Sequence, residues 1–215
     1  MGRNLDRIDI NLMRSGTKKD LSTRFGMYET DDTAAENSET ASISIDFVVP
    51  LDLIKEWKRC SIVSDFFANY QSFSFDNGKE AVSILSTITN ELLENAIKFS
   101  SDKNKIMSLS IRHLGNRISI ETINVTNENY AKKMSQFLNK FSEEPNLETA
   151  ILSQIEHTAE NNAADSGVGL MTMISSYDAK LGVKIESNVN DHFYNVYVKV
   201  SIDDNRLIKK TGHPT

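Results

Sequence analysis

Two pairs of alternating segments constrain the fold of this chain most strongly. The first pair, KIMSLSIRHL and RISIETINV, is separated only by Gly115 and Asn116. The second pair, GVKIESN and FYNVYVKVSI, is separated by a short polar segment that contains Asp191 and His192. Apolar and polar residues that alternate on both sides of a turn form the pattern of a β-hairpin. We therefore predict two hairpins in a mainly antiparallel sheet.

Helical segments precede and separate these hairpins. Before the first hairpin we expect a strand at 42–49 ended by Pro50, one or two helices at 51–70, a turn at 76–78 and a helix at 79–99. Between the two hairpins we expect a mostly helical segment at 127–162 and a helix that opens at 165–170 and ends before Gly182. This order predicts an α+β fold in which helices cover one face of a mixed, mainly antiparallel sheet.

The first 41 residues differ in composition from the rest. RIDINLM alternates and could form a short strand, whereas residues 14–41 include the polar, acidic stretch TDDTAAENSETA, which is typical of a linker or loop. We therefore divide the chain into an N-terminal extension at 1–41, a domain at 42–203 and a C-terminal tail at 204–215.

The charge balance argues against nucleic acids and anionic membranes as partners. The chain has 24 Lys and Arg residues and 30 Asp and Glu residues, a net charge of −6. No apolar run approaches the roughly 18–20 residues that span a bilayer, and the N-terminus contains no stretch that resembles a signal peptide. We expect a cytoplasmic protein.

The cysteine and the histidines suggest no metal centre. Cys60 is the only cysteine, which excludes a disulfide framework, and we expect a small buried helix residue rather than a reactive thiol. The histidines, none of which has metal-ligand spacing, are expected at the surface or in turns; they are His113, His157, His192 and His213.

The helix at 79–99 has two different sides. The residues expected to meet the sheet are Val82, Leu85, Thr89, Leu92, Leu93 and Ala96. Glu91, Asn95 and Lys98 fall on another line, since residues four and seven positions apart are neighbours on a helix. This line is either a solvated face or part of a nucleotide site. In the second case an Asn oxygen suits Mg²⁺ and a glutamate suits a general base.

A second motif could complete such a site. Gly167 and Gly169 in DSGVGL directly precede and open a helix. Glycines let the backbone approach an anion closely, and a helix N-terminus presents free N–H groups to phosphates. Glycines also begin helices for ordinary reasons, so this motif alone is weak.

The chain resembles the GHKL ATPase domain, which has the Bergerat or histidine-kinase-like ATPase fold. Two motifs carry the resemblance: NELLENAIKFS, and the later SGVGLMTMISSYDAKLGVKIES with its closing hairpin. The resemblance covers residues 42–203 and implies a two-layer α/β sandwich that binds ATP and Mg²⁺. It implies that Asn95 binds magnesium, that Glu91 is the catalytic base and that Lys98 lies near the phosphates. It also implies a phosphate-binding glycine box, formed by Gly167, Val168, Gly169 and Leu170.

The chain departs from the family pattern at the adenine position. The family has Asp-x-Gly-x-Gly after the strand that follows the first motif, and this chain has Asn124 nearby with no glycine. Asn124 is our candidate for adenine recognition, although an amide discriminates less sharply than the family's Asp. The segment at 127–162 corresponds to the family's ATP lid, and we expect it to serve packing or partner contact.

Within the family, the chain is most similar to anti-sigma-factor serine kinases and to SiaB-type bacterial regulators. This resemblance implies a serine/threonine protein kinase that acts on a small STAS-type antagonist in a partner-switching system. The alternative is a non-catalytic regulator that keeps the fold with a degraded nucleotide site. A third possibility is an unrelated α+β protein in which Glu91 and Asn95 are only solvated. A homodimer is possible.

Overall fold

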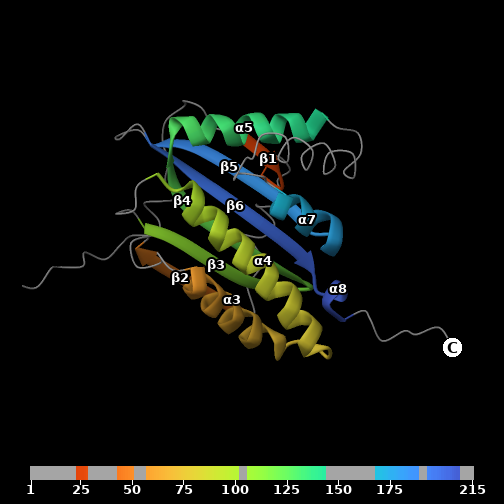
Figure 1. Cartoon of the computed structure of the whole chain (residues 1–215). Helices are drawn as coiled ribbons and strands as arrows, with labels where there is room; N and C mark the ends of the chain where they lie inside the picture. The colour runs from red at the N-terminus through yellow and green to blue at the C-terminus, as the bar shows by residue number, and fades with distance from the viewer. Residues whose placement is uncertain are drawn as a thin grey trace, which may run out of the picture.

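The chain folds into a sheet with helices packed on one face (Figure 1). The computed structural model describes residues 23–28, 43–50, 57–101, 106–143, 168–188 and 193–208. The side chains of the terminal residues of some elements, such as Trp57, Val168 and Leu170, are outside this description. The predicted α+β class is confirmed, and this arrangement is compatible with the expected two-layer sandwich. The possible short strand at 7–13 and the polar stretch at 30–41 lie outside the described residues.

Six strands form one sheet in the order β1-β5-β6-β4-β3-β2. Their bounds are β1 Thr23–Gly26, β2 Ile43–Pro50, β3 Ile106–Leu114, β4 Arg117–Asn127, β5 Lys180–Asn188 and β6 Phe193–Asp203. Every pairing between the described strands is antiparallel. The expected mainly antiparallel sheet is therefore present, but the expected parallel component is absent from the described strands.

Both predicted hairpins are confirmed. β3 and β4 join through a turn in which Gly115 has a φ of 56°. Glycine adopts this left-handed conformation at no steric cost, which explains its place in the turn. β5 pairs with β6 over the whole length of β5, and β4 pairs with β6. The two hairpins thus form the four central strands of one continuous sheet.

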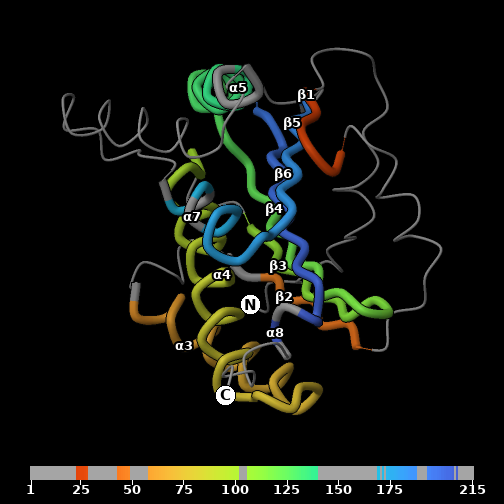
Figure 2. The backbone as a smooth tube through the Cα atoms, turned by 90° about the vertical axis from the view of Figure 1, so that its right-hand side faces the viewer, coloured from red at the N-terminus to blue at the C-terminus, as the bar shows by residue number. Residues whose placement is uncertain are grey.

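The helices begin and end close to the predicted positions. Their bounds are α3 Trp57–Ser72, α4 Gly78–Phe99, α5 Glu128–Glu143, α7 Val168–Tyr177 and α8 Asn205–Ile208. Figures 1 and 2 show α3, α4 and α7 on the same face of the sheet, and α5 across one end of it. In the part of the chain that the structure describes, no helix has both the length and the hydropathy of a membrane span.

The core lies between α4 and the sheet. Of the six residues predicted to face the sheet, five are buried, and Val82 is partly buried against the core. Ala81, Ile88 and Ile97 are buried as well, because α4 packs against α3 and α7 in addition to the sheet. A single amphipathic stripe therefore underestimates how much of α4 is covered.

Three expectations about local structure are wrong. β1 lies inside the stretch predicted as a linker, because its four residues are too few for an alternating signal and gain their hydrogen bonds from β5. Gly78, expected in the turn, is the first residue of α4. The short helix α8 begins at Asn205 in the predicted tail, and its Leu207 is fully buried.

Cys60 and His113 occupy buried positions. Cys60 is 1% exposed between α3 and α4, and burial raises the pKa of its thiol, which agrees with the expected inert helix residue. His113 was expected at the surface or in a turn, but it lies within β3. Its ring stacks on Phe75, and its Nε2 is 3.5 Å from Asp204 Oδ2. The remaining histidines lie outside the described residues.

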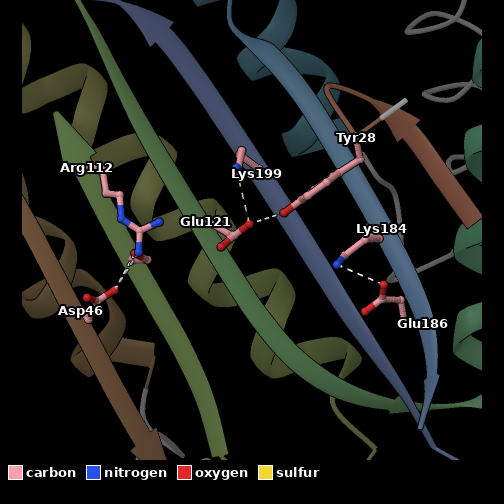
Figure 3. Close-up of polar contacts among 8 residues, drawn as sticks. Tyr28, Asp46, Arg112, Glu121, Lys184, Glu186 and Lys199 are labelled. Carbon is pink, nitrogen blue, oxygen red and sulfur yellow. Dashed lines mark hydrogen bonds and ion pairs between the residues drawn. The ribbon is translucent and has the colours of Figure 1, made fainter. Parts of the chain in front are cut away.

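The opposite face of the sheet carries a set of paired polar side chains (Figure 3), of which those on β4 and β6 are poorly exposed. Glu121 on β4 is 8% exposed and Lys199 on β6 is 7% exposed. Tyr28 donates a hydrogen bond to Glu121 Oε1, and Lys199 Nζ lies 3.8 Å from the same oxygen. Buried charges are costly unless they are paired. The pairing of these side chains therefore accounts for their presence under such low exposure.

Similar pairs continue across this face. Ser110 Oγ donates a hydrogen bond to Asp46 Oδ1 at 2.6 Å. The same Asp46 oxygen lies 3.7 Å from Arg112 Nη2. Lys184 Nζ lies 3.1 Å from Glu186 and 3.9 Å from the centre of the Tyr197 ring. Period-two alternation separates these residues from the apolar side chains that face the helices. The sequence pattern predicts this separation, but it does not predict the low exposure.

Candidate functional site

The side of α4 that faces α7 carries the three polar residues singled out from the sequence. Glu91, Asn95 and Lys98 are each half-buried. They follow one another along the helix at intervals of four and three residues, which places them on one side. The line is therefore neither a fully solvated face nor part of the core. Half-burial leaves these groups within reach of a ligand while weakening their contact with water.

Glu91 packs directly against Gly169 on α7. A Cβ atom built on Gly169 would lie 2.9 Å from Glu91 Cδ and 3.7 Å from its Cγ, so the carboxylate occupies the space that a side chain would fill. Two predicted site residues that are far apart in the sequence are thus in contact. Because the neighbouring atoms are the end of a flexible side chain, a larger residue here would displace the carboxylate rather than disrupt the helix packing.

This contact lies at the N-terminal end of α7. Gly169 is the second residue of this ten-residue helix. The N-terminal turn of a helix has unpaired N–H groups and a partial positive charge, both of which favour an anion. The Glu91 carboxylate is the anion that the protein itself places beside this turn.

The surroundings of Glu91 favour its protonated form more than water does. Burial is the largest cause of its raised pKa, and the charge of Glu94 raises the pKa further. The nearby ammonium of Lys98 acts in the opposite direction. A carboxyl group with a raised pKa is a stronger base when ionised, which is the property that a general base needs near neutral pH.

Asn124 joins β4 to the C-terminal end of α4. It is 2% exposed, and its side-chain amide donates to Ser100 Oγ at 3.2 Å. Ser100 Oγ in turn donates to the Ala96 carbonyl at 2.5 Å, and Thr126 Oγ1 donates to the Phe99 carbonyl at 2.6 Å. These bonds satisfy carbonyls that the last turn of a helix leaves unpaired. The described contacts thus give Asn124 a structural role, and adenine recognition stays a prediction.

The candidate residues are spread along α4 in a definite order. Glu91 contacts α7, Asn95 and Lys98 follow one and two turns later, and Ser100 meets Asn124 at the end of the helix. At 1.5 Å per residue, Glu91 and Ser100 are separated by about 13 Å along the helix axis.

Of the predicted glycine box, the structure describes Gly169 in full. Gly167 lies outside the described residues, and only the backbones of Val168 and Leu170 are described. The predicted opening of a helix at this motif is nevertheless confirmed, because α7 begins at Val168. In the segment expected to correspond to an ATP lid, α5 occupies 128–143, and residues 144–162 lie outside the described residues.

The donor set at this place fits magnesium but not a metal held by protein alone. Among the residues with described side chains, no group of three or more His, Cys, Asp or Glu could hold a metal ion. Mg²⁺ takes oxygen ligands and usually keeps several waters, so that one or two protein groups suffice when phosphate oxygens supply the rest. The side-chain oxygen of Asn95 is the candidate protein ligand.

Two contributors to this region were not identified from the sequence. Glu94, one turn from Glu91, accepts a hydrogen bond from Asn90 Nδ2 at 2.6 Å and raises the pKa of Glu91. Ser100 carries the link between Asn124 and α4. A serine directly after a helix and a second acid within one turn of the first were the available signals, but neither distinguishes a site from an ordinary helix surface.

Comparison with known proteins does not assign this chain to a family, since no family model and no curated protein matches its sequence.

Proposed function

We propose that this protein binds ATP with Mg²⁺ along the side of α4 that faces α7, and that it transfers the γ-phosphate to a serine or threonine of a small STAS-type partner protein. In this proposal the two-layer sandwich is a histidine-kinase-like ATPase fold. The observation that carries the proposal is the contact between Glu91 and Gly169, which unites an acid from one motif with a glycine from the other.

The order of the candidate groups supports this assignment. Gly169 at the start of α7 would hold the terminal phosphates beside Glu91, and Asn95 would hold the magnesium ion one turn away. Lys98 would add positive charge near the phosphates. Asn124, at the far end of the line, would be the nearest of these groups to the adenine. The magnesium ion would neutralise phosphate charge.

Glu91 is the residue proposed to act in the chemical step. Its carboxylate accepts the proton of the partner's hydroxyl group as the hydroxyl oxygen bonds to the γ-phosphorus. The bond between that phosphorus and the β,γ-bridging oxygen breaks, and ADP leaves. The products are a phosphorylated partner, ADP and the proton that Glu91 later releases to water. The raised pKa of Glu91 suits this role.

The first test is calorimetric titration of Mg-ATP into the wild-type protein and into Asn95→Ala. We expect saturable binding that requires magnesium and that weakens by at least about tenfold in the variant, the equivalent of one lost charge-assisted contact of about 1.4 kcal/mol. Asn69→Ala is the matched control, because Asn69 is an exposed asparagine on α3. Wild-type protein that binds no Mg-ATP at millimolar concentration would refute the nucleotide site.

One observation favours the non-catalytic alternative. The amide of Asn124 is already bonded to Ser100 and is almost fully buried, and the family's aspartate and glycines are missing at this position. A regulator that acts only by binding its partner would then retain the fold without using ATP. Radiolabelled phosphate transferred to the partner by wild-type protein, and lost in Glu91→Gln, would contradict this alternative.

A further inference from the structure

A short segment at the edge of the sheet contacts three different parts of the molecule. It comprises β1 and the two residues that follow, Met27 and Tyr28, and we call it the β1 segment. Among the described strands, β1 pairs only with β5. Figures 1 and 2 show β1 beside α5 at the same end of the sheet. A four-residue edge strand has few backbone hydrogen bonds, so side-chain contacts contribute much of its attachment.

Two glycines let the chain leave β1 and cross onto the polar face of the sheet. Gly26 has a φ of 57°, and a Cβ atom there would clash with the Leu181 carbonyl oxygen. A Cβ atom on Gly182, which pairs with Gly26, would lie 2.9 Å from Met27 Cβ and 3.1 Å from Tyr28 Cδ2. A side chain at either glycine would therefore push the β1 segment away from β5.

Tyr28 is bound on the polar face by charged side chains. Its hydroxyl group donates a hydrogen bond to Glu121 Oε1 on β4 (Figure 3). The centre of its ring lies 5.3 Å from Lys199 Nζ and 5.7 Å from Lys184 Nζ. Because Glu121 is buried, the departure of Tyr28 would remove a hydrogen bond that the carboxylate needs. This cost stabilises the β1 segment on the sheet.

The other side of β1 contacts α5. Thr23 and Phe25 pair with Ile185 and Val183, whose buried side chains face the helices. The oxygen Oγ1 of Thr23 lies 3.4 Å from Ser135 Oγ on α5. Phe25 packs against the hydrophobic core. The β1 segment thus binds the polar face through Tyr28 and α5 through Thr23.

The same helix meets the end of the candidate site. The ring of Tyr130, in the first turn of α5, lies 5.9 Å from the ring of Phe99, the last residue of α4. Lys98 Nζ lies 5.4 Å from the centre of the Phe99 ring. Tyr130 and Ser135 are separated by about 7.5 Å along the helix axis. One helix therefore joins the contact with β1 to the contact with α4.

We propose that the β1 segment regulates the candidate nucleotide site by holding α5 against the end of α4. With the segment on β5, the contacts of Ser135 and Tyr130 are both made, and the site has its higher affinity for Mg-ATP. When the segment leaves, α5 loses its contact with Thr23, the contact between Tyr130 and Phe99 loosens, and the affinity falls. By linkage, bound Mg-ATP favours the attached segment. This inference rests on the proposed function, because it assigns a regulator to the same site.

The first test needs no nucleotide. Tyr28→Ala in the full chain should release the β1 segment, so that amide hydrogen exchange in α5 becomes at least about fivefold faster. Exchange in α3, near the opposite edge of the sheet, should not change (Figure 1). Tyr70→Ala is the matched control, because Tyr70 is a half-exposed tyrosine on α3. Unchanged exchange in α5 of the Tyr28→Ala variant would overturn the proposal.

A reversible disulfide compares the attached and releasable states within one protein. Thr23→Cys with Ser135→Cys, in a chain that also carries Cys60→Ala, places two thiols where oxygens now lie 3.4 Å apart, within reach of a disulfide after a small adjustment. We expect the oxidised form to bind Mg-ATP at least about fivefold more tightly than the reduced form in calorimetric titration. Thr23→Cys with Gln136→Cys, an exposed position on α5, should form the bond much more slowly.

The outcomes separate this proposal from the proposed function. Equal affinities of the oxidised and reduced forms for Mg-ATP would overturn the regulation and leave the nucleotide site in place. Wild-type protein that binds no Mg-ATP would refute the nucleotide site, and the regulation with it. Faster exchange in α5 of Tyr28→Ala, together with tighter binding by the oxidised form, would support both.

Discussion

The two flanks of α4 show how one helix can serve stability on one side and a candidate site on the other. On the flank that faces α3, Cys60, Phe67 and Ala68 are buried, and the contact between the helices is mostly apolar. On the flank that faces α7, a carboxylate packs against a glycine. The first arrangement stabilises the fold through burial, whereas the second desolvates a charge.

The difference separates two glutamates that are only three residues apart. Glu94 accepts a hydrogen bond from Asn90, and its charge acts on Cys60 of α3. Glu91 contacts α7, and its pKa is raised mainly by burial. The first turn of α7 favours an anion at this position, but burial still raises the pKa of Glu91. A desolvated carboxyl group with a raised pKa, in contact with a second motif, is what marks Glu91 as a functional candidate.

The largest expected effect compares the two glutamates directly. Glu91→Gln should lower the rate of phosphate transfer by about 10²–10⁴-fold, because the amide cannot accept the proton. Glu94→Gln should leave the rate within the same order of magnitude, since glutamine keeps the acceptor for Asn90. Transfer of labelled phosphate to the partner measures both. An equal loss in the two variants would remove the distinction between the flanks.

The next effect compares two glycines at the start of helices. Gly169→Ala should displace the Glu91 carboxylate and lower phosphate transfer by about 100-fold, the cost of misplacing a catalytic group by about 1 Å. Gly78→Ala, at the start of α4, should leave the rate unchanged, since its Cβ would lie 3.4 Å from the Ser72 carbonyl oxygen and nearer to nothing else.

Unfolding by denaturant completes this comparison. Each alanine should leave the free energy of unfolding unchanged or raise it by about 0.4–1 kcal/mol, since alanine favours the helix and restricts the unfolded chain more than glycine does. A large loss of stability in Gly169→Ala would mean that Glu91 is held in place too firmly to move, and that the contact is structural.

A smaller effect concerns the pH dependence of phosphate transfer. The rate should rise with pH as Glu91 ionises. Removing the positive charge with Lys98→Met should raise the pKa of Glu91 and move this rise to higher pH. Removing the negative charge with Glu94→Gln should lower the pKa and move the rise to lower pH. Both shifts should be modest because burial is the largest cause. Identical profiles for both variants would show that a group other than Glu91 controls the rate.

The smallest effect concerns stability. Since the folded state raises the pKa of Glu91, it holds this proton more tightly than the unfolded chain does. The free energy of folding that this proton contributes is present below the ordinary carboxyl pKa. It is lost as the pH rises through the raised pKa of Glu91 in the folded protein. Glu91→Gln should therefore unfold at a slightly higher temperature than wild type at neutral pH. Differential scanning calorimetry at acid pH, where the advantage should disappear, provides the check.

The sequence predicts most of the fold because its strongest patterns are local. Alternation around Gly115 predicts the β3–β4 hairpin, and the periodicity of residues 79–99 predicts α4 to within one residue. β1 was missed because its four residues become a strand only by pairing with β5, and His113 was misplaced because its burial depends on Phe75 and Asp204. These contacts join distant segments and leave no periodic signal.

The candidate site could be predicted only in part. Spacing along α4 identifies Glu91, Asn95 and Lys98 as neighbours, and the glycines identify the start of α7. The contact between Glu91 and Gly169 depends on how two helices pack, which no local pattern specifies. Similarly, the bond between Asn124 and Ser100 depends on how the end of α4 meets β4. The residue types therefore identify the candidate residues, but the sequence does not predict the tertiary contacts between them.

The position of Cys60 supplies the protein with a built-in reporter. Because this thiol is the only one in the chain and lies between α3 and α4, a thiol reagent can reach it only when the two helices separate. The labelling rate therefore records how often the helical layer opens, without any introduced probe. A ligand held along α4 would slow that labelling, so that one native thiol would report binding at the candidate site.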